Sequence, residues 1–252
     1  EMLGGTRPAK YVLPEQYTHD EKWPLLLLLH GYSANISNRA ISGGDIQDGY
    51  LGLSKRASQY GFIMLIPHGT HDSKNNQFWN ATDYCCDFEK TGVDDVSYLT
   101  ALLDETAAHF NVDPKRVYLI GHSNGAFMSY RLACSEGERF AALVSIAGTS
   151  YWDASMCQPA TSKVSVLQVH GTEDSVIEYN GSPGYFCGAE EIVERWVDRN
   201  GCKTEGETLP SLDIVSSDSG SETSVKRWSQ CDDNTVTELW TLNGIGHIPG
   251  FT

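Results

Sequence analysis

The stretch Val117-Tyr118-Leu119-Ile120-Gly121-His122-Ser123-Asn124-Gly125 puts a serine between a buried strand and a helix. Residues 117–120 are apolar, aromatic or β-branched, which is typical of a strand covered on both faces. Residues 126–133 follow with apolar side chains at helical spacing. The two glycines leave room for a tight turn that lifts the Ser123 hydroxyl clear of the backbone. An ordinary Gly/Ser turn is the alternative, and the neighbouring strand and helix favour the exposed serine.

Apolar runs alternate with helical patterns along the whole chain. The runs predicted as strands are residues 23–29, 62–66, 117–120, 141–146, 164–169 and 236–242. Apolar residues recur at helical spacing over residues 50–60, 93–110 and 190–200. This alternation predicts an α/β fold with an open, mainly parallel sheet and helices on both faces. We expect one domain over residues 1–252, with a polar surface excursion at about 203–228.

The charge balance excludes some classes of partner. The 252 residues include 33 acidic residues and 18 Lys or Arg residues, for a net charge of −15. This excess opposes binding to nucleic acid or to an anionic membrane. The longest apolar run, Leu25 to Leu29, is far too short to span a bilayer. No signal peptide is recognised, and a start at Glu1 is expected of a mature or a trimmed chain.

The cysteines indicate an oxidising compartment. The chain has seven of them, at positions 85, 86, 134, 157, 187, 202 and 231. No C-x-x-C pair is present, which argues against a zinc site and favours disulfides. We expect a bridge between Cys202 and Cys231 across the polar excursion, and at least one cysteine outside any intrachain bridge. Because adjacent cysteines do not easily bond to each other, Cys85 and Cys86 are each expected to pair elsewhere.

Three reactive side chains, Ser123, Asp174 and His247, each follow a predicted strand. The carboxyl ends of parallel strands meet at one edge of a sheet, so these side chains are expected to lie together. A serine becomes nucleophilic when an imidazole takes its proton and a carboxylate holds that imidazole. Their order along the chain, Ser–Asp–His, is one of the known orders for this chemistry.

Other residues compete for two of these roles. Three further histidines near strand ends are alternatives to His247 as the base: His30, His122 and His170. Two acidic neighbours are alternatives to Asp174 as the carboxylate: Glu173 and Glu178. We favour His247 because it follows the last strand, and Asp174 because it lies at its loop tip. Asp94 and Asp95 begin a predicted helix and are interpreted as capping or structural residues.

The remaining site predictions concern the oxyanion and the substrate. The backbone N–H of Asn124, after the serine, and that of Tyr32, in the turn after residues 25–29, are the expected oxyanion donors. The Tyr32 ring is a candidate wall of the site. Trp79 and Trp152 are candidate substrate-binding residues, although loop packing is an equal interpretation of Trp79.

Ordered motifs from about Tyr11 to the C-terminus resemble a known family. They lie at residues 30–35, 77–83, 85–88, 93–96, 112–114, 121–125, 170–174 and 239–240. Together they resemble the secreted polyhydroxybutyrate depolymerases and feruloyl esterases, which are similar to carbohydrate esterase family 1. The resemblance implies a secreted, single-domain α/β-hydrolase without a cofactor, and makes residues 121–125 its nucleophile elbow. It implies the same triad of Ser123, Asp174 and His247.

Two departures from that family stand near the C-terminus. Ile248-Pro249-Gly250 replaces the usual Trp-Pro-Gly, which removes one aromatic wall of the site. The family also leads us to expect a closing helix beyond Thr252, which is therefore missing from this chain.

The expected function is a secreted or periplasmic serine esterase that forms an acyl-enzyme. Feruloyl or other aromatic esters and hydroxyalkanoate esters are its expected substrates. We expect a monomer or weak dimer, with no metal and no cofactor. A serine peptidase of the same fold and a non-catalytic hydrolase-like binding protein are the alternatives; a peptide-versus-ester panel and fluorophosphonate labelling separate them.

Overall fold

The computed structural model describes residues 2–32, 43–157, 162–203, 205–216, 218 and 220–251. Within these residues, ten strands form one sheet in the order β1-β2-β4-β3-β7-β8-β9-β12-β11-β10, and β5 and β6 form a separate pair. The first strands are β1 (Met2–Leu3), β2 (Ala9–Val12), β3 (Trp23–Leu29), β4 (Ile63–Ile66), β5 (Thr70–His71) and β6 (Gln77–Phe78). They are followed by β7 (Val112–His122), β8 (Ala142–Ile146), β9 (Ser165–Gly171), β10 (Glu207–Leu212), β11 (Thr223–Trp228) and β12 (Thr237–Leu242).

The centre of the sheet is parallel and its two margins are antiparallel. Strands β4, β3, β7, β8, β9 and β12 pair in parallel. Strands β1 and β2 at one margin and β11 and β10 at the other pair antiparallel. The structure thus confirms the predicted α/β fold with a mainly parallel sheet.

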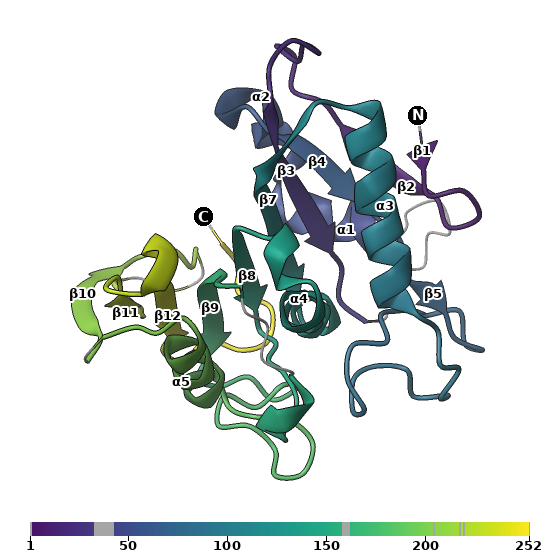
Figure 1. The fold of residues 1–252 in the computed structure, drawn as a ribbon. Coiled ribbons are helices and arrows are strands. Elements are labelled where there is room, and N and C mark those ends of the chain that lie inside the picture. The colour runs from purple at the N-terminus through teal and green to yellow at the C-terminus, as the bar shows by residue number, and fades with distance from the viewer. Residues whose placement is uncertain are drawn as a thin grey trace.

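Helices cover both faces of this sheet (Figure 1). They are α1 (Gly43–Leu51), α2 (Ala57–Tyr60), α3 (Asp95–His109), α4 (Asn124–Ser135) and α5 (Ala189–Arg199). Alternate residues of β3 pack on opposite faces: Leu27 lies in the core with α3, α4 and α5, whereas Leu28 packs in the cluster beside α1. This period of two explains why the strand is apolar throughout.

Two segments differ from the sequence-based expectation. The helix expected over residues 50–60 is divided, because α1 ends before Gly52 and α2 begins only at Ala57. Gly52 has a φ of +64°, a left-handed conformation that ends a helix. The expected surface excursion at 203–228 contains β10 and β11, which extend the sheet at its margin. β10 is mostly exposed, so its polar side chains face solvent.

The disulfides correct one prediction and confirm another. The expected bridge between Cys202 and Cys231 is present, and a second bridge joins Cys134 to Cys157. The expectation that Cys85 and Cys86 pair elsewhere is wrong, because they are bonded to each other across a cis peptide; the prediction assumed an ordinary trans peptide. Cys187 is buried and outside the three bridges. None of the described helices is long and apolar enough to cross a membrane.

Candidate active site

Ser123 lies at a sharp turn between β7 and α4. Its φ of 55° and ψ of −121° belong to neither the strand nor the helix. A Cβ on Gly121 would collide with the carbonyl oxygen of Gly125, and one on Gly125 would collide with that of Leu29. The backbone therefore requires glycine at both ends of the pentapeptide, as the sequence suggested. The carbonyl oxygen of Ser123 accepts from the N–H of Ala126, at 2.9 Å, which starts the helix directly behind the serine.

The structure brings Ser123, His247 and Asp174 together, although they come from three separate loops. The hydroxyl of Ser123 donates to Nε2 of His247, with 3.0 Å between the heavy atoms. Nδ1 of His247 donates to Oδ2 of Asp174 at 2.8 Å. The Asp174 side chain is fully buried and that of His247 is 15% exposed. This geometry allows the imidazole to take the serine proton while the carboxylate holds its other nitrogen.

Asp174 is held ionised by donors on its own loop and on the imidazoles. Its Oδ1 accepts from the backbone N–H of Val176 at 2.8 Å and of Ile177 at 2.9 Å. Burial alone would raise the pKa of Asp174, but hydrogen bonds from His170 and His247 and from the Ile177 backbone lower it well below its usual range. A permanent carboxylate beside Nδ1 favours the protonated imidazole that forms after proton transfer.

The competing residues have other partners. Glu173 and Glu178 are exposed on the same loop as Asp174. His170 contacts the Asp174 carboxylate at 3.3 Å and donates from Nε2 to the carbonyl of Ile177 at 2.8 Å. His170 therefore supports the carboxylate instead of facing the serine.

His30 and His122 are buried neutral rings. His122 donates from Nε2 to the backbone carbonyl of His247 at 3.0 Å. His30 donates from Nδ1 to the carbonyl of Gly31 at 2.8 Å, and its Nε2 accepts from the N–H of Gly69 at 2.9 Å. Burial lowers the pKa of each ring to about 4. Both therefore brace backbone beside the site.

The two expected oxyanion donors lie on segments that flank the serine. Asn124 is the first residue of α4, and Tyr32 follows β3. The turn before Tyr32 packs on the serine turn, since a Cβ on Gly31 would lie 3.4 Å from Cβ of Ser123. Among the described residues, no acceptor binds the backbone N–H of Tyr32 or of Asn124.

The Tyr32 side chain is fixed beside this turn. Its hydroxyl donates to Oδ2 of Asp72 at 2.7 Å and accepts from Nδ2 of Asn76 at 3.3 Å. Its ring meets that of Phe88 edge to face, with 5.1 Å between centroids, and Phe88 is exposed. Tyr32 and Phe88 thus form an aromatic pair. Phe88 was not predicted as a site residue, because the sequence alone does not show which aromatic side chain of the loops contacts Tyr32.

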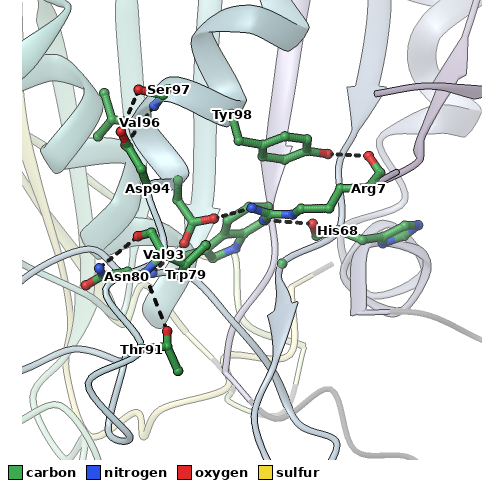
Figure 2. Close-up of polar contacts among 12 residues, drawn as sticks. Arg7, His68, Trp79, Asn80, Thr91, Val93, Asp94, Val96, Ser97 and Tyr98 are labelled. Carbon is green, nitrogen blue, oxygen red and sulfur yellow. Dashed lines mark hydrogen bonds and ion pairs between the residues drawn. The ribbon is translucent and has the colours of Figure 1, made fainter. Parts of the chain in front are cut away.

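Of the two interpretations of Trp79, the structure favours loop packing over substrate binding. Its side chain is fully buried, and its indole N–H donates to the carbonyl of His30 at 3.0 Å. Arg7 lies over the same ring, with 5.8 Å from the guanidinium carbon to the ring centroid (Figure 2). Trp152 is 44% exposed, and its backbone carbonyl accepts from Arg195 at 2.7 Å. Among the described residues, no hydrogen bond or ring contact joins the Trp152 indole to the residues around Ser123.

The side chain of Asn124 is a feature that sequence reasoning missed. It is fully buried and forms two hydrogen bonds with the backbone of Trp79. Only the backbone N–H of Asn124 was assigned a role from the sequence. The pattern G-x-S-x-G leaves this position variable, so it carries no signal for the contact. No group of three or more potential metal ligands occurs among the described residues.

Comparison with known proteins agrees with this architecture. A sequence model of the prolyl oligopeptidase family (Peptidase_S9) matches residues 56–180. A probable feruloyl esterase C of Aspergillus clavatus is 29% identical over 85% of this chain and 66% of its own length. Feruloyl esterase B of Piromyces equi is 28% identical over 94% of this chain and 42% of its own. The chain thus spans between about two fifths and two thirds of the length of these relatives.

Solved structures show the same fold. The acetyl xylan esterase from Aspergillus awamori superposes with a TM-score of 0.67 at 15% identity, over 98% of this chain and 93% of that one. The esterase PE8 gives a TM-score of 0.58 at 19% identity, over 98% of this chain and 91% of that one. The chain therefore has the α/β-hydrolase fold, and the predicted resemblance to feruloyl esterases is confirmed.

Proposed function

We propose, on the premise that this chain is an α/β-hydrolase related to feruloyl esterases, that it is a serine carboxylic-ester hydrolase. The observation that carries the proposal is the hydrogen-bonded series from Ser123 through His247 to Asp174. The three residues lie on loops at the carboxyl end of a parallel sheet, where such sites assemble. The curated relatives named as feruloyl esterases support an ester as the substrate.

The chemistry begins with proton transfer to His247. Nε2 takes the proton of the Ser123 hydroxyl as Oγ bonds to the ester carbonyl carbon. The carbonyl oxygen becomes an oxyanion, to which the backbone N–H groups of Tyr32 and Asn124 donate. His247 then gives its proton to the leaving alcohol oxygen as that carbon–oxygen bond breaks, which leaves an acyl-enzyme on Ser123.

Water completes the cycle. His247 takes a proton from the water, whose oxygen attacks the acyl carbon, and then returns a proton to Oγ of Ser123 as the acid leaves. Throughout, Asp174 accepts from Nδ1 and so keeps Nε2 directed at Ser123. Each step uses only these side chains and two backbone amides.

The aromatic pair of Tyr32 and Phe88 supports aromatic acyl groups as substrates, with feruloyl esters first among them. Hydroxyalkanoate esters are a second class that the same chemistry would serve. Three disulfides support a secreted or periplasmic location. The match to the prolyl oligopeptidase family keeps a peptidase as the second candidate function.

Replacing the nucleophile tests the mechanism. Ser123→Ala is expected to lower kcat on p-nitrophenyl acetate by about four to six orders of magnitude, since the hydroxyl forms the covalent bond. Ser135→Ala is the matched control, because Ser135 is exposed at the end of the same helix. Far-UV circular dichroism checks that both variants fold. Retention of activity by Ser123→Ala would reject the assignment.

A substrate panel tests the specificity. Methyl ferulate, acetylated xylan, hydroxybutyrate oligomers, aromatic polyesters and a prolyl p-nitroanilide would each be assayed with wild-type protein. We expect the highest kcat/KM on methyl ferulate. Faster cleavage of the anilide than of any ester would favour the peptidase, and an inert Ser123 that resists fluorophosphonate would favour a binding protein.

A further inference from the structure

Trp79 and Asn124 are joined by a pair of hydrogen bonds. The backbone N–H of Trp79 donates to Oδ1 of Asn124 at 2.7 Å, and Nδ2 of Asn124 donates to the carbonyl of Trp79 at 2.9 Å. Both side chains are fully buried. Because a buried amide that uses both its donor and its acceptor has one allowed orientation, this pair fixes Asn124 at the start of α4. The backbone N–H of Asn124 is one of the two proposed oxyanion donors.

The indole of Trp79 reaches the segment that carries the other donor. Its N–H donates to the carbonyl of His30 at 3.0 Å, and the two rings lie 4.9 Å apart between centroids. His30 in turn donates from Nδ1 to the carbonyl of Gly31 at 2.8 Å. That carbonyl and the N–H of Tyr32 belong to one planar peptide unit. Fixing the direction of the carbonyl therefore fixes the direction of the Tyr32 N–H.

Trp79 is itself held from several sides. Its carbonyl also accepts from the N–H of Cys86 at 3.1 Å, within the loop that carries the Cys85–Cys86 disulfide. The next residue, Asn80, donates its N–H to Oδ2 of Asp95 at 2.7 Å. Asp95 is paired with Arg7 at 2.7 Å, and Figure 2 shows the Arg7 side chain lying between Trp79 and Tyr98. Trp79 and its loop are thus held by several contacts that are at least partly buried.

We propose that Trp79 is the positioning residue of the oxyanion hole, holding the Tyr32 N–H through His30 and the Asn124 N–H through the Asn124 side chain. The inference rests on the proposed esterase function and adds to it a residue that touches neither substrate nor nucleophile. Oxyanion donors stabilise charge that develops only in the transition state, so their displacement lowers kcat and leaves ground-state binding unchanged. Full burial of Trp79 thus has a functional reason as well as a packing one.

Two substitutions test this role from its two sides. Trp79→Phe keeps an aromatic ring and removes the N–H that reaches His30, whereas Asn124→Ala keeps the backbone N–H and removes the side chain that reaches Trp79. Each is expected to lower kcat on p-nitrophenyl acetate by about 10- to 100-fold, somewhat less than the loss of a whole oxyanion donor. KM is expected to stay within about twofold of wild type. The inhibition constant of a trifluoromethyl ketone, which forms an oxyanion on the serine, should rise by the same factor.

Trp23→Phe is the matched control. Trp23 is also buried and also donates its indole N–H to a backbone carbonyl, that of Thr18 at 2.9 Å, but it lies at the opposite end of β3 from the site. It is expected to lose stability without losing kcat. Because the two test variants are independent, one that fails to fold leaves the other to decide.

The outcomes separate this inference from the proposed function. Suppose that wild type hydrolyses the ester, and that the folded Trp79→Phe or Asn124→Ala protein has the same kcat and the same inhibition constant as wild type. This result would overturn the positioning role of Trp79 and leave the proposed function standing. Equal losses of kcat in Trp23→Phe would overturn the positioning role as well, since the effect would then be general. Absence of ester hydrolysis in wild type would overturn both.

Discussion

His30 and His122 place two neutral imidazoles beside the serine turn. Their exposed fractions are 1% and 7%, and burial lowers the pKa of each from 6.5 to about 4. Each ring supports backbone on one side of the site: His30 at the carbonyl of Gly31, and His122 at the carbonyl of His247. The backbone of the base, His247, is therefore supported by the neutral ring of His122. The peptide that carries the proposed oxyanion donor of Tyr32 is supported by the neutral ring of His30.

This burial predicts a loss of stability in weak acid. Between pH 6.5 and about 4 the unfolded chain binds protons on both rings and the folded chain does not. The contribution of these rings to the free energy of unfolding is therefore fully present above this window, and it is lost as pH falls through the window. The upper limit is about 3 kcal/mol for each ring. Urea unfolding at intervals from pH 7.5 to 4 measures it.

His122→Gln isolates one ring, because glutamine can still donate an N–H but does not titrate in this range. We expect a visibly shallower fall of the free energy of unfolding with pH in this variant. His109→Gln is the control, since His109 is exposed near the end of α3. An identical pH dependence in all three proteins would show that the buried imidazole of His122 does not contribute.

At the level of single residues, the sequence predicted which residues form the site better than it predicted what each residue packs against. Ser123, Asp174 and His247 could be selected because strand ends converge in any parallel sheet, whatever the detailed packing. Trp79 could not be assigned, because its burial depends on Arg7, which is far away in the sequence, and on how its loop packs on the start of α3. The bond between Cys85 and Cys86 was missed for a similar reason: the local backbone geometry is set by the fold of the whole loop.

The start of α3 shows how neighbouring carboxylates divide two tasks. Asp94 caps the helix, since its Oδ1 accepts from the N–H of Ser97 at 3.0 Å, and it is exposed. Asp95, one residue later, is 1% exposed, pairs with Arg7 and accepts from the N–H of Asn80. Both were interpreted from the sequence as capping or structural. The structure assigns the cap to Asp94 and the anchoring of the Trp79 loop to Asp95.

Substituting the two carboxylates is therefore expected to give different results. Asp94→Ala removes a cap and should lower the free energy of unfolding by about 1 kcal/mol, with kcat unchanged. Asp95→Ala leaves Arg7 without its partner and should lower it by about 3 kcal/mol. Because Asp95 also holds Asn80 beside Trp79, kcat should fall in this variant. Urea titrations measure the free energy of unfolding of both variants, and ester kinetics measure their kcat. Equal losses in the two variants would contradict the separate roles of Asp94 and Asp95.

At the level of elements, the parallel strands were predictable and the margins were not. The predicted strand at 23–29 coincides with β3, and the others fall within a few residues of observed strands except that β7 begins earlier, at Val112. Their continuous apolar runs reflect burial on both faces. Strand β10 was missed because it is mostly exposed and contains Pro210, which is tolerated at a sheet edge. Its sequence alone carries neither an apolar run nor a clear alternation.

Over the whole molecule, the site depends on both ends of the chain. The N-terminal segment passes beside α3, where the N–H of Gly4 donates to Glu105 at 2.9 Å (Figure 1). This segment carries Arg7, which pairs with Asp95 and lies against the ring of Trp79. The C-terminal segment carries His247 and is held by Tyr50, whose hydroxyl donates to the carbonyl of Pro249 at 2.5 Å. Residues far apart in the sequence thus set the geometry of one serine.

The far margin of the sheet is held by a disulfide as well as by a small buried cluster of its own. The disulfide between Cys202 and Cys231 joins the end of α5 to the turn before β12, at a sequence separation of 29, and the segment it closes contains β10 and β11. Closing a loop of that length reduces the entropy of the unfolded chain and stabilises the fold by about 3.5 kcal/mol. The bond lies outside the contacts that hold Ser123, so its loss should lower stability while kcat is retained.

The double variant Cys202→Ser with Cys231→Ser tests this separation of stability from catalysis. We expect its free energy of unfolding to fall by about 3.5 kcal/mol, and kcat measured well below its Tm to stay within about twofold of wild type. The pair Cys134→Ser with Cys157→Ser opens a bridge of sequence separation 23 and gives a comparison of similar expected size. A loss below about 1 kcal/mol would mean that strand pairing alone holds the margin. A large fall in kcat would instead mean that the Cys202–Cys231 disulfide helps to position β12, the strand that leads into the His247 loop.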